Sequence, residues 1–109
     1  MRRTLFLTAF TALLLVLMVC AGCGAPSNVV VHITGKGFNP AKVTVKVGGT
    51  VTWVNDDKTQ GHTVTEVQEA FDSNAIDPGH TFTHRFDHAG TVDYYCRFHP
   101  NEKGEVVVR

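Results

Sequence analysis

Apolar and polar residues alternate in short runs along most of the chain. Residues 42–47 place a valine at every second position between lysines and a threonine, and residues 50–55 repeat the alternation around Trp53. A period of two is typical of a β-strand with one buried side and one side that faces solvent. The pattern therefore predicts β-structure for this part of the chain.

Further runs rich in β-branched and aromatic residues extend this pattern. Together they predict about seven strands, at residues 29–33, 42–47, 50–55, 62–67, 81–86, 91–96 and 104–109. Glycines and polar loops separate the runs, and residues 69–79 show no sustained period. Short strands with turn signals between them favour an all-β fold, a two-sheet Greek-key β-sandwich.

Residues 1–23 follow a different pattern, because two arginines precede a long apolar stretch. The apolar stretch covers residues 5–19, and two small residues stand directly before Cys23. This order is typical of a secretory signal peptide. It resembles a bacterial lipoprotein signal, which is cleaved before a cysteine that becomes lipidated, although Cys20 stands where such signals usually have leucine.

Three outcomes are open for this segment: lipidation at Cys23, ordinary cleavage, and retention as a membrane anchor. Retention is open because an apolar run of about 18 residues approaches the roughly 20 that span a bilayer. Each outcome places the rest of the chain outside the cytoplasm. We accordingly divide the chain into a signal peptide at 1–23 with a lipobox-like Cys23, a tether at 24–28, and one domain at 29–109.

Composition and charge narrow the range of functions. The formal net charge of the 109 residues is +0, which predicts no basic surface for nucleic acid. A hydrophobic content of 43% is sufficient for a packed core. The sequence contains no recognisable Ser-His-Asp set and no glycine-rich phosphate loop, so it favours a binding or carrier protein over an enzyme.

Three metal-ligating residue types stand close together near the C-terminus. Cys96, His99 and Glu102 follow one another at three-residue steps, and a polar loop leads into a further histidine, His62. Thiolate and imidazole ligands favour copper or zinc. Cys96 is the one cysteine outside the N-terminal segment, and metal ligation explains a lone thiol in an oxidising compartment. A buried, inert cysteine is the alternative.

The chain resembles the small cupredoxins of the plastocyanin and amicyanin type. The matching residues are 38–40, 47–56, 62–64 and 94–100. The resemblance implies a mononuclear copper site with His62, Cys96 and His99 as ligands, and a redox partner protein that docks transiently at the exposed edge of His99. It also suggests that the Thr63 hydroxyl braces the Cys96 loop.

Glu102 occupies the position at which the short-loop members of this family carry an axial methionine. Both methionines of the chain, Met1 and Met18, fall in the N-terminal segment. As a fourth ligand, Glu102 would favour Cu(II) over Cu(I) and lower the reduction potential, as in the red-copper type of cupredoxin. In the other reading Glu102 faces solvent, and water or the Gly61 carbonyl takes the axial position.

The other histidines are interpreted as surface or partly buried residues and not as ligands. Three of them, in and beside the predicted strand 81–86, fall on the same alternate positions as two phenylalanines, and the fourth has no evident partner in the sequence: His80, His84, His88 and His32.

We therefore expect a monomeric electron-transfer protein of the bacterial cell envelope, lipid-anchored in the periplasm, with copper as its cofactor. A copper-buffering protein is one alternative. A zinc-binding domain without a redox role is another, because one cysteine, two histidines and a glutamate also form a tetrahedral zinc set.

Overall fold

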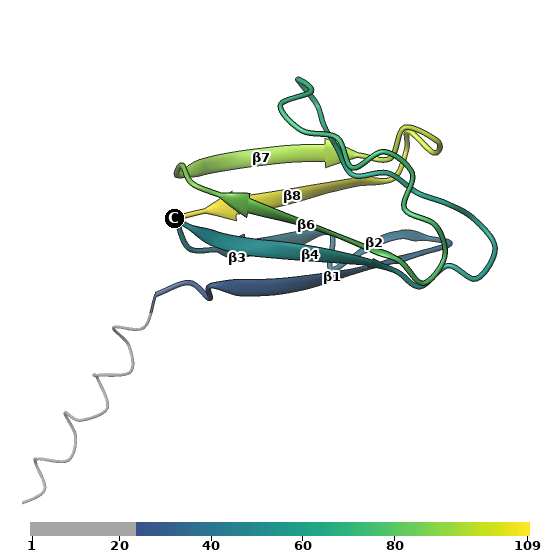
Figure 1. Ribbon diagram of the computed structural model, residues 1–109. Coiled ribbons are helices and arrows are strands. Elements are labelled where there is room, and N and C mark those ends of the chain that lie inside the picture. The colour runs from purple at the N-terminus through teal and green to yellow at the C-terminus, as the bar shows by residue number, and fades with distance from the viewer. Residues whose placement is uncertain (1–23) are drawn as a thin grey trace, which may run out of the picture.

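The computed structural model describes residues 24–109. The predictions for the signal peptide and for Cys23 concern residues outside this range. Eight strands form two four-stranded sheets (Figure 1). The first sheet has the order β2-β1-β4-β6 and consists of β1 (Asn28–Thr34), β2 (Gly37–Asn39), β4 (Gly49–Asn55) and β6 (Thr81–Phe86). The second has the order β3-β8-β7-β5 and consists of β3 (Lys42–Val45), β5 (Thr65–Glu66), β7 (Gly90–Tyr95) and β8 (Lys103–Val108).

The connections of the sandwich cross from one sheet to the other at every step from β2 to β7. Two pairs of strands distant in sequence, β1 with β4 and β3 with β8, run parallel, and the other pairs run antiparallel. The predicted all-β, two-sheet Greek-key sandwich is confirmed. No helix within residues 24–109 is long and apolar enough to cross a membrane.

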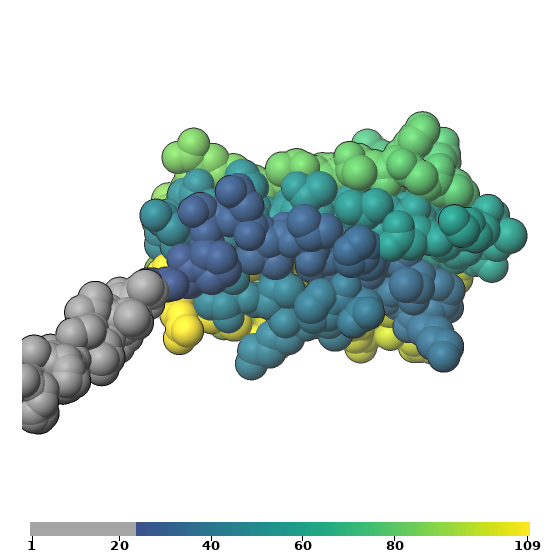
Figure 2. All heavy atoms as spheres, turned by 90° about the horizontal axis from the view of Figure 1, so that it is seen from below, coloured from purple at the N-terminus to yellow at the C-terminus, as the bar shows by residue number. Residues whose placement is uncertain are grey.

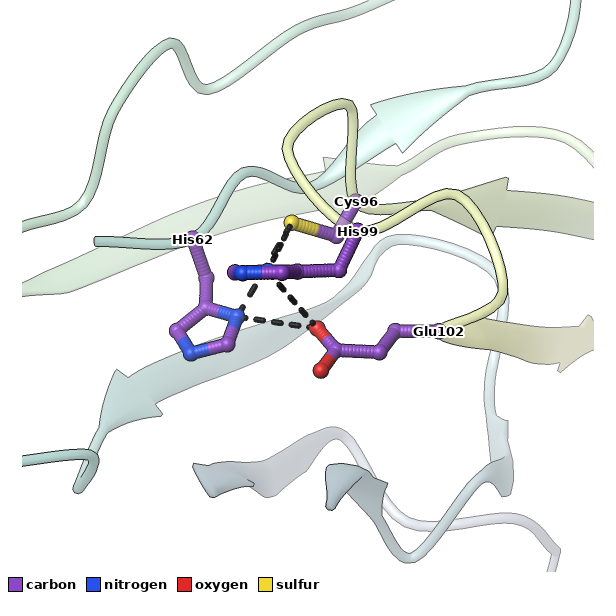
Figure 3. Close-up of side chains that lie close together, drawn as sticks. All are labelled: His62, Cys96, His99 and Glu102. Carbon is purple, nitrogen blue, oxygen red and sulfur yellow. Dashed lines mark hydrogen bonds and ion pairs between the residues drawn. The ribbon is translucent and has the colours of Figure 1, made fainter. Parts of the chain in front are cut away.

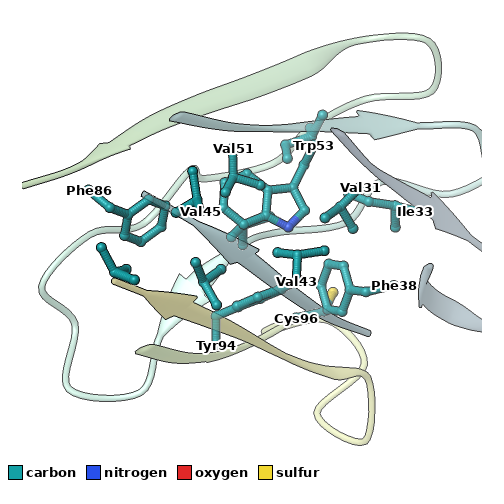
Figure 4. Packing of buried hydrophobic residues seen from close by; sticks show 14 residues of the cluster. Val31, Ile33, Phe38, Val43, Val45, Val51, Trp53, Phe86, Tyr94 and Cys96 are labelled. Atoms are coloured by element: carbon teal, nitrogen blue, oxygen red, sulfur yellow. The ribbon is translucent and has the colours of Figure 1, made fainter. Parts of the chain in front are cut away.

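The alternation that predicted strands also orients them. Along β4 every second residue is buried and the residues between are half-buried, which matches the period of two. The buried sides of the two sheets pack against each other (Figure 4). Their core consists of Val31, Ile33, Phe38, Val43, Val45, Val51, Trp53, Val64, Ile76, Phe86, Tyr94, Cys96, Val106 and Val108.

The predicted strand at residues 62–67 is reduced to the two residues of β5. The reason is that the backbone changes partner along this stretch. His62 exchanges two backbone hydrogen bonds with Ile76, and Ser73 N donates to Val64 O, so only the end of the stretch pairs with β7. The short strand β2 was not predicted, because its three residues, the first of which is Gly37, are too few to show a period.

Tyr94 is the central aromatic residue of the core. Its ring meets Trp53 edge-on at a centroid distance of 5.3 Å and Phe38 at 4.7 Å. Gly104 lies opposite Tyr94 in the pairing of β7 with β8, and a Cβ atom at this glycine would collide with the tyrosine ring. A residue without a side chain at position 104 therefore makes room for the ring.

Two polar atoms of this aromatic group, Trp53 Nε1 and the Tyr94 hydroxyl oxygen, are buried without a hydrogen-bond partner among the described residues. Burial of the phenol raises the pKa of Tyr94 to about 12, because removal from water penalises the charged phenolate. In the unfolded chain the same group titrates near its ordinary pKa of about 10.

This difference predicts a loss of stability at alkaline pH that depends on Tyr94. Because the folded-state pKa is raised, the stabilisation is fully present below about pH 10 and is lost as the pH rises towards 12, by about 1.4 kcal/mol per pH unit. The free energy of unfolding of the unaltered chain should therefore fall relative to that of Tyr94→Phe as the pH rises over this range. Urea unfolding of the metal-free protein at several pH values measures the difference. Tyr95→Phe is the control, and a difference between Tyr94→Phe and the unaltered chain that does not change with pH would contradict the assignment.

Candidate metal centre

Four side chains converge at one end of the sandwich: His62, Cys96, His99 and Glu102 (Figure 3). Cys96 directly follows β7, and His99 and Glu102 lie on the loop that leads into β8. His62 arrives from the connection between β4 and β5. The site therefore joins one tight loop of the second sheet to a segment that begins in the first sheet.

Backbone hydrogen bonds close the loop that carries three of these residues. Cys96 N donates to Glu102 O at 3.0 Å, His99 N donates to Cys96 O at 3.2 Å, and Glu102 N donates to His99 O at 2.8 Å. Each three-residue step is thus one turn of backbone closed by its own hydrogen bond. This folding brings side chains at three-residue spacing to a common point.

The donor atoms of the four residues lie within 4.8 Å of one another. Cys96 Sγ is 3.8 Å from His62 Nδ1 and 3.6 Å from His99 Nδ1. Glu102 Oε1 is 3.5 Å from His99 Nδ1 and 2.9 Å from His62 Nδ1. A tetrahedral ion with bonds of about 2.0–2.3 Å holds its ligand atoms about 3.3–3.8 Å apart. Three of the four separations fall in that range, and the His62–Glu102 pair is at hydrogen-bond distance.

The four side chains differ strongly in exposure. Cys96 is fully buried, and the His62 and Glu102 side chains are 1% and 14% exposed. The His99 side chain is 34% exposed. Glu102 points towards the two imidazoles and not to solvent (Figure 3), so the structure does not support the reading in which this carboxylate faces water.

Thr63 connects the two segments that form the site. Its backbone N donates to Cys96 Sγ at 3.4 Å, and its hydroxyl accepts a hydrogen bond from Arg97 N at 2.8 Å. The predicted bracing of the Cys96 loop by the Thr63 hydroxyl is confirmed. The hydrogen bond from Thr63 N fixes the position of the sulfur, and a cysteine binds metal as its thiolate.

Asp57 is a functional candidate that the sequence did not reveal. Its Oδ2 lies 2.8 Å from His62 Nε2, on the side of the ring away from Cys96. The hydrogen bond from His62, followed by those from Thr59, lowers the pKa of the Asp57 carboxyl to about 2. The only available signal was a carboxylate in the polar loop before His62, and such a spacing does not by itself imply contact.

The other histidines lie apart from this group. His32 Nδ1 is 2.6 Å from Asp56 Oδ2 at the surface. The His84 ring stacks on Phe71 at a centroid distance of 4.0 Å, and desolvation by burial lowers the pKa of His84. His80 and His88 are exposed.

The chain is similar to known proteins along most of its length. It matches the family model of the cupredoxin-like domain over residues 7–108. It is 34% identical over 84 residues to plastocyanin of Scenedesmus fuscus, a match that covers 66% of this chain and 86% of that protein. It is 34% identical over 88 residues to amicyanin of Paracoccus denitrificans, covering 77% of this chain and 67% of that protein.

Similarity to solved structures extends to the arrangement of the backbone. A purple cupredoxin from Nitrosopumilus maritimus superimposes with a TM-score of 0.69 at 30% sequence identity, covering 74% of this chain and 99% of that one. The similarity thus reaches over nearly the whole of that protein.

Proposed function

The chain belongs to the cupredoxin-like family, and on this basis we propose that it is an electron-transfer protein with a single copper ion. His62, Cys96 and His99 are its proposed ligands, and Glu102 is the fourth. The observation that carries the proposal is the convergence of four possible ligand atoms within 4.8 Å of one another at one end of the sandwich. Two nitrogens and one thiolate sulfur form the ligand set associated with electron-transfer copper.

The residues of the site fit such an ion chemically. Copper, when bound, supplies a couple between Cu(II) and Cu(I). The buried Cys96 sulfur is held in place by Thr63 N, and both imidazoles direct Nδ1 towards it (Figure 3). A site whose ligands are already in position changes little between oxidation states, and this favours fast electron transfer.

His99 is the proposed route for electrons between the site and the surface. Its side chain is 34% exposed, whereas that of His62 is 1% exposed. Phe98, the neighbour of His99, is 50% exposed, and Pro100 is exposed as well. A small apolar surface beside an accessible ligand suits brief docking of a redox partner protein, because transient electron-transfer contacts are small.

We also propose that the protein is held in the bacterial cell envelope by a lipidated Cys23. The basic start, apolar stretch and small residues of 1–23 support this location. Residue 24 and the C-terminus lie at one end of the sandwich, and the loop of residues 96–102 lies at the other (Figure 1). In the space-filling view the described chain likewise begins at one end of the elongated body (Figure 2). Anchoring at residue 23 would leave the site free to meet a partner.

The copper proposal predicts an intense visible absorption band when Cu(II) is added to the metal-free chain, because the Cys96 thiolate donates charge to the ion. Cys96→Ser should remove the band and keep the β-sandwich, as read by circular dichroism. Cys23→Ser is the matched control and should keep the band. Tight zinc binding without any thiolate-to-copper band or redox couple in the unaltered protein would instead favour a zinc domain.

Glu102→Met is predicted to raise the reduction potential. The substitution replaces an anionic oxygen donor, which favours Cu(II), with a soft and weak donor. Each tenfold change in the ratio of Cu(II) to Cu(I) affinity moves the potential by about 59 mV, and we expect a change of at least about that size. Glu102→Gln, which removes only the charge, should shift the potential in the same direction. If both variants keep the original potential and spectrum, Glu102 is not a ligand, and water or the Gly61 carbonyl would take the fourth position.

Lipidation predicts that the mature protein begins at Cys23 and carries several acyl chains, which together anchor a protein durably. Mass spectrometry of the N-terminal peptide measures this directly. Cys23→Ala should abolish the added mass and leave a species of altered processing, whereas Ser27→Ala, which lies outside the signal, should keep the added mass. An unmodified N-terminus beyond residue 23 would refute the lipid anchor.

A further inference from the structure

The imidazole of His62 is held from both of its nitrogens. Nδ1 faces the site, 2.9 Å from Glu102 Oε1 and 3.8 Å from Cys96 Sγ. Nε2 points the opposite way, to the Asp57 carboxylate at 2.8 Å. The His62 side chain is 1% exposed and that of Asp57 is 10% exposed, so little water competes for this contact.

Asp57 is itself fixed by the loop that follows β4. Its Oδ1 accepts hydrogen bonds from the backbone N of Thr59 at 3.1 Å and from the Thr59 hydroxyl at 3.3 Å. The backbone N of Asp57 donates to Asn55 Oδ1 at 2.9 Å.

Asn55 connects this loop to the interior of the sandwich. It is the fully buried last residue of β4, and its Nδ2 donates to Gln60 O at 2.9 Å and to Ile76 O at 2.8 Å. A continuous set of hydrogen bonds thus runs from a core strand through Asn55 and Asp57 to His62.

A carboxylate at Nε2 decides which form of the imidazole faces a metal. It accepts a hydrogen bond from Nε2–H, and with the ring proton on Nε2 the lone pair of Nδ1 is directed at the site. It also makes the ring a stronger donor and fixes its orientation. His99, with a side chain 34% exposed, stands in a more solvated setting, so the two histidines are not equivalent.

We infer that Asp57 is a positioning residue of the metal centre, which locks His62 in the Nε2–H form and, through its negative charge, stabilises Cu(II) relative to Cu(I). The inference rests on the proposed copper function. In this view a carboxylate that is not itself a ligand controls the orientation of His62 and the preference of the site for Cu(II).

The neighbouring residue provides a matched control. Asp56 carries the same charge one position earlier and pairs with His32 at 2.6 Å, but its side chain is 47% exposed and that of His32 is 51% exposed. Asp56→Asn therefore removes an equal charge and a similar carboxylate–histidine contact without touching His62. Effects of Asp57→Asn that exceed those of Asp56→Asn report on the contact with His62.

The first test compares metal binding and redox behaviour of the full chain with Asp57→Asn, Asp57→Ala and Asp56→Asn. Zn(II) affinity, measured by competition with a chelator, should fall about 10–100-fold in Asp57→Ala, as is typical for loss of such a partner. In Asp57→Asn the ratio of Cu(II) to Cu(I) affinity should fall about tenfold, which raises the potential by about 59 mV. Asp56→Asn should change either quantity by less than about twofold, because its exposed charge is screened. Equal effects of Asp57→Asn and Asp56→Asn on both quantities would overturn the inference.

The second test uses the unaltered protein and does not depend on the folding of a variant. In the zinc-loaded chain, nitrogen-15 NMR should place the ring proton of His62 on Nε2, and this proton should exchange with water much more slowly than that of His99. Exchange of the two protons at similar rates would overturn the inference.

These outcomes separate this inference from the proposed function. If the unaltered chain shows no thiolate-to-copper band, the proposed function fails, and the zinc affinities and the ring proton still test the Asp57 contact. If the band and the redox couple are present and Asp57→Asn behaves as Asp56→Asn does, only the role of Asp57 fails.

Discussion

Closure of the short loop between β7 and β8 is the constraint on which the rest of the site depends. The hydrogen bond from Cys96 N to Glu102 O joins the ends of this loop where the two strands part. Two further backbone bonds inside the loop turn His99 and Glu102 back towards Cys96. Because the antiparallel register of β7 and β8 fixes both ends, the backbone sets the relative positions of the three residues in the loop. Thr63 then attaches this loop to the segment that brings His62.

The strands and the loop that carries three of the site residues could be predicted from the sequence, because both depend on neighbouring residues. The contacts between segments distant in sequence could be predicted only partly. Alternating valines around Trp53 identified the strands because a period of two is a local property, and the spacing of Cys96, His99 and Glu102 identified their loop for the same reason. His62 was assigned through family resemblance, since nothing in its own neighbourhood points to the loop of Cys96.

What the sequence did not reveal depends on the path of the chain through space. The contact of Asp57 with His62 requires the loop after β4 to fold back on itself, and hydrogen bonds made by Asn55 hold that fold. The truncated strand β5 has a similar cause, because His62 pairs with Ile76 across an irregular connection. Neither pairing leaves a periodic trace in the sequence.

The pairing of Tyr94 with Gly104 has a consequence for protein engineering. The ring of Tyr94 occupies the space that a side chain at position 104 would need. Tyr94 lies in β7 shortly before Cys96, and Gly104 lies in β8 shortly after Glu102. These two residues mark the border between the interior and the seven-residue segment 96–102. A segment of different length and ligand spacing could be exchanged between them while the packing behind it stays the same. The sandwich can thus serve as a fixed scaffold on which the metal preference of the loop is redesigned separately.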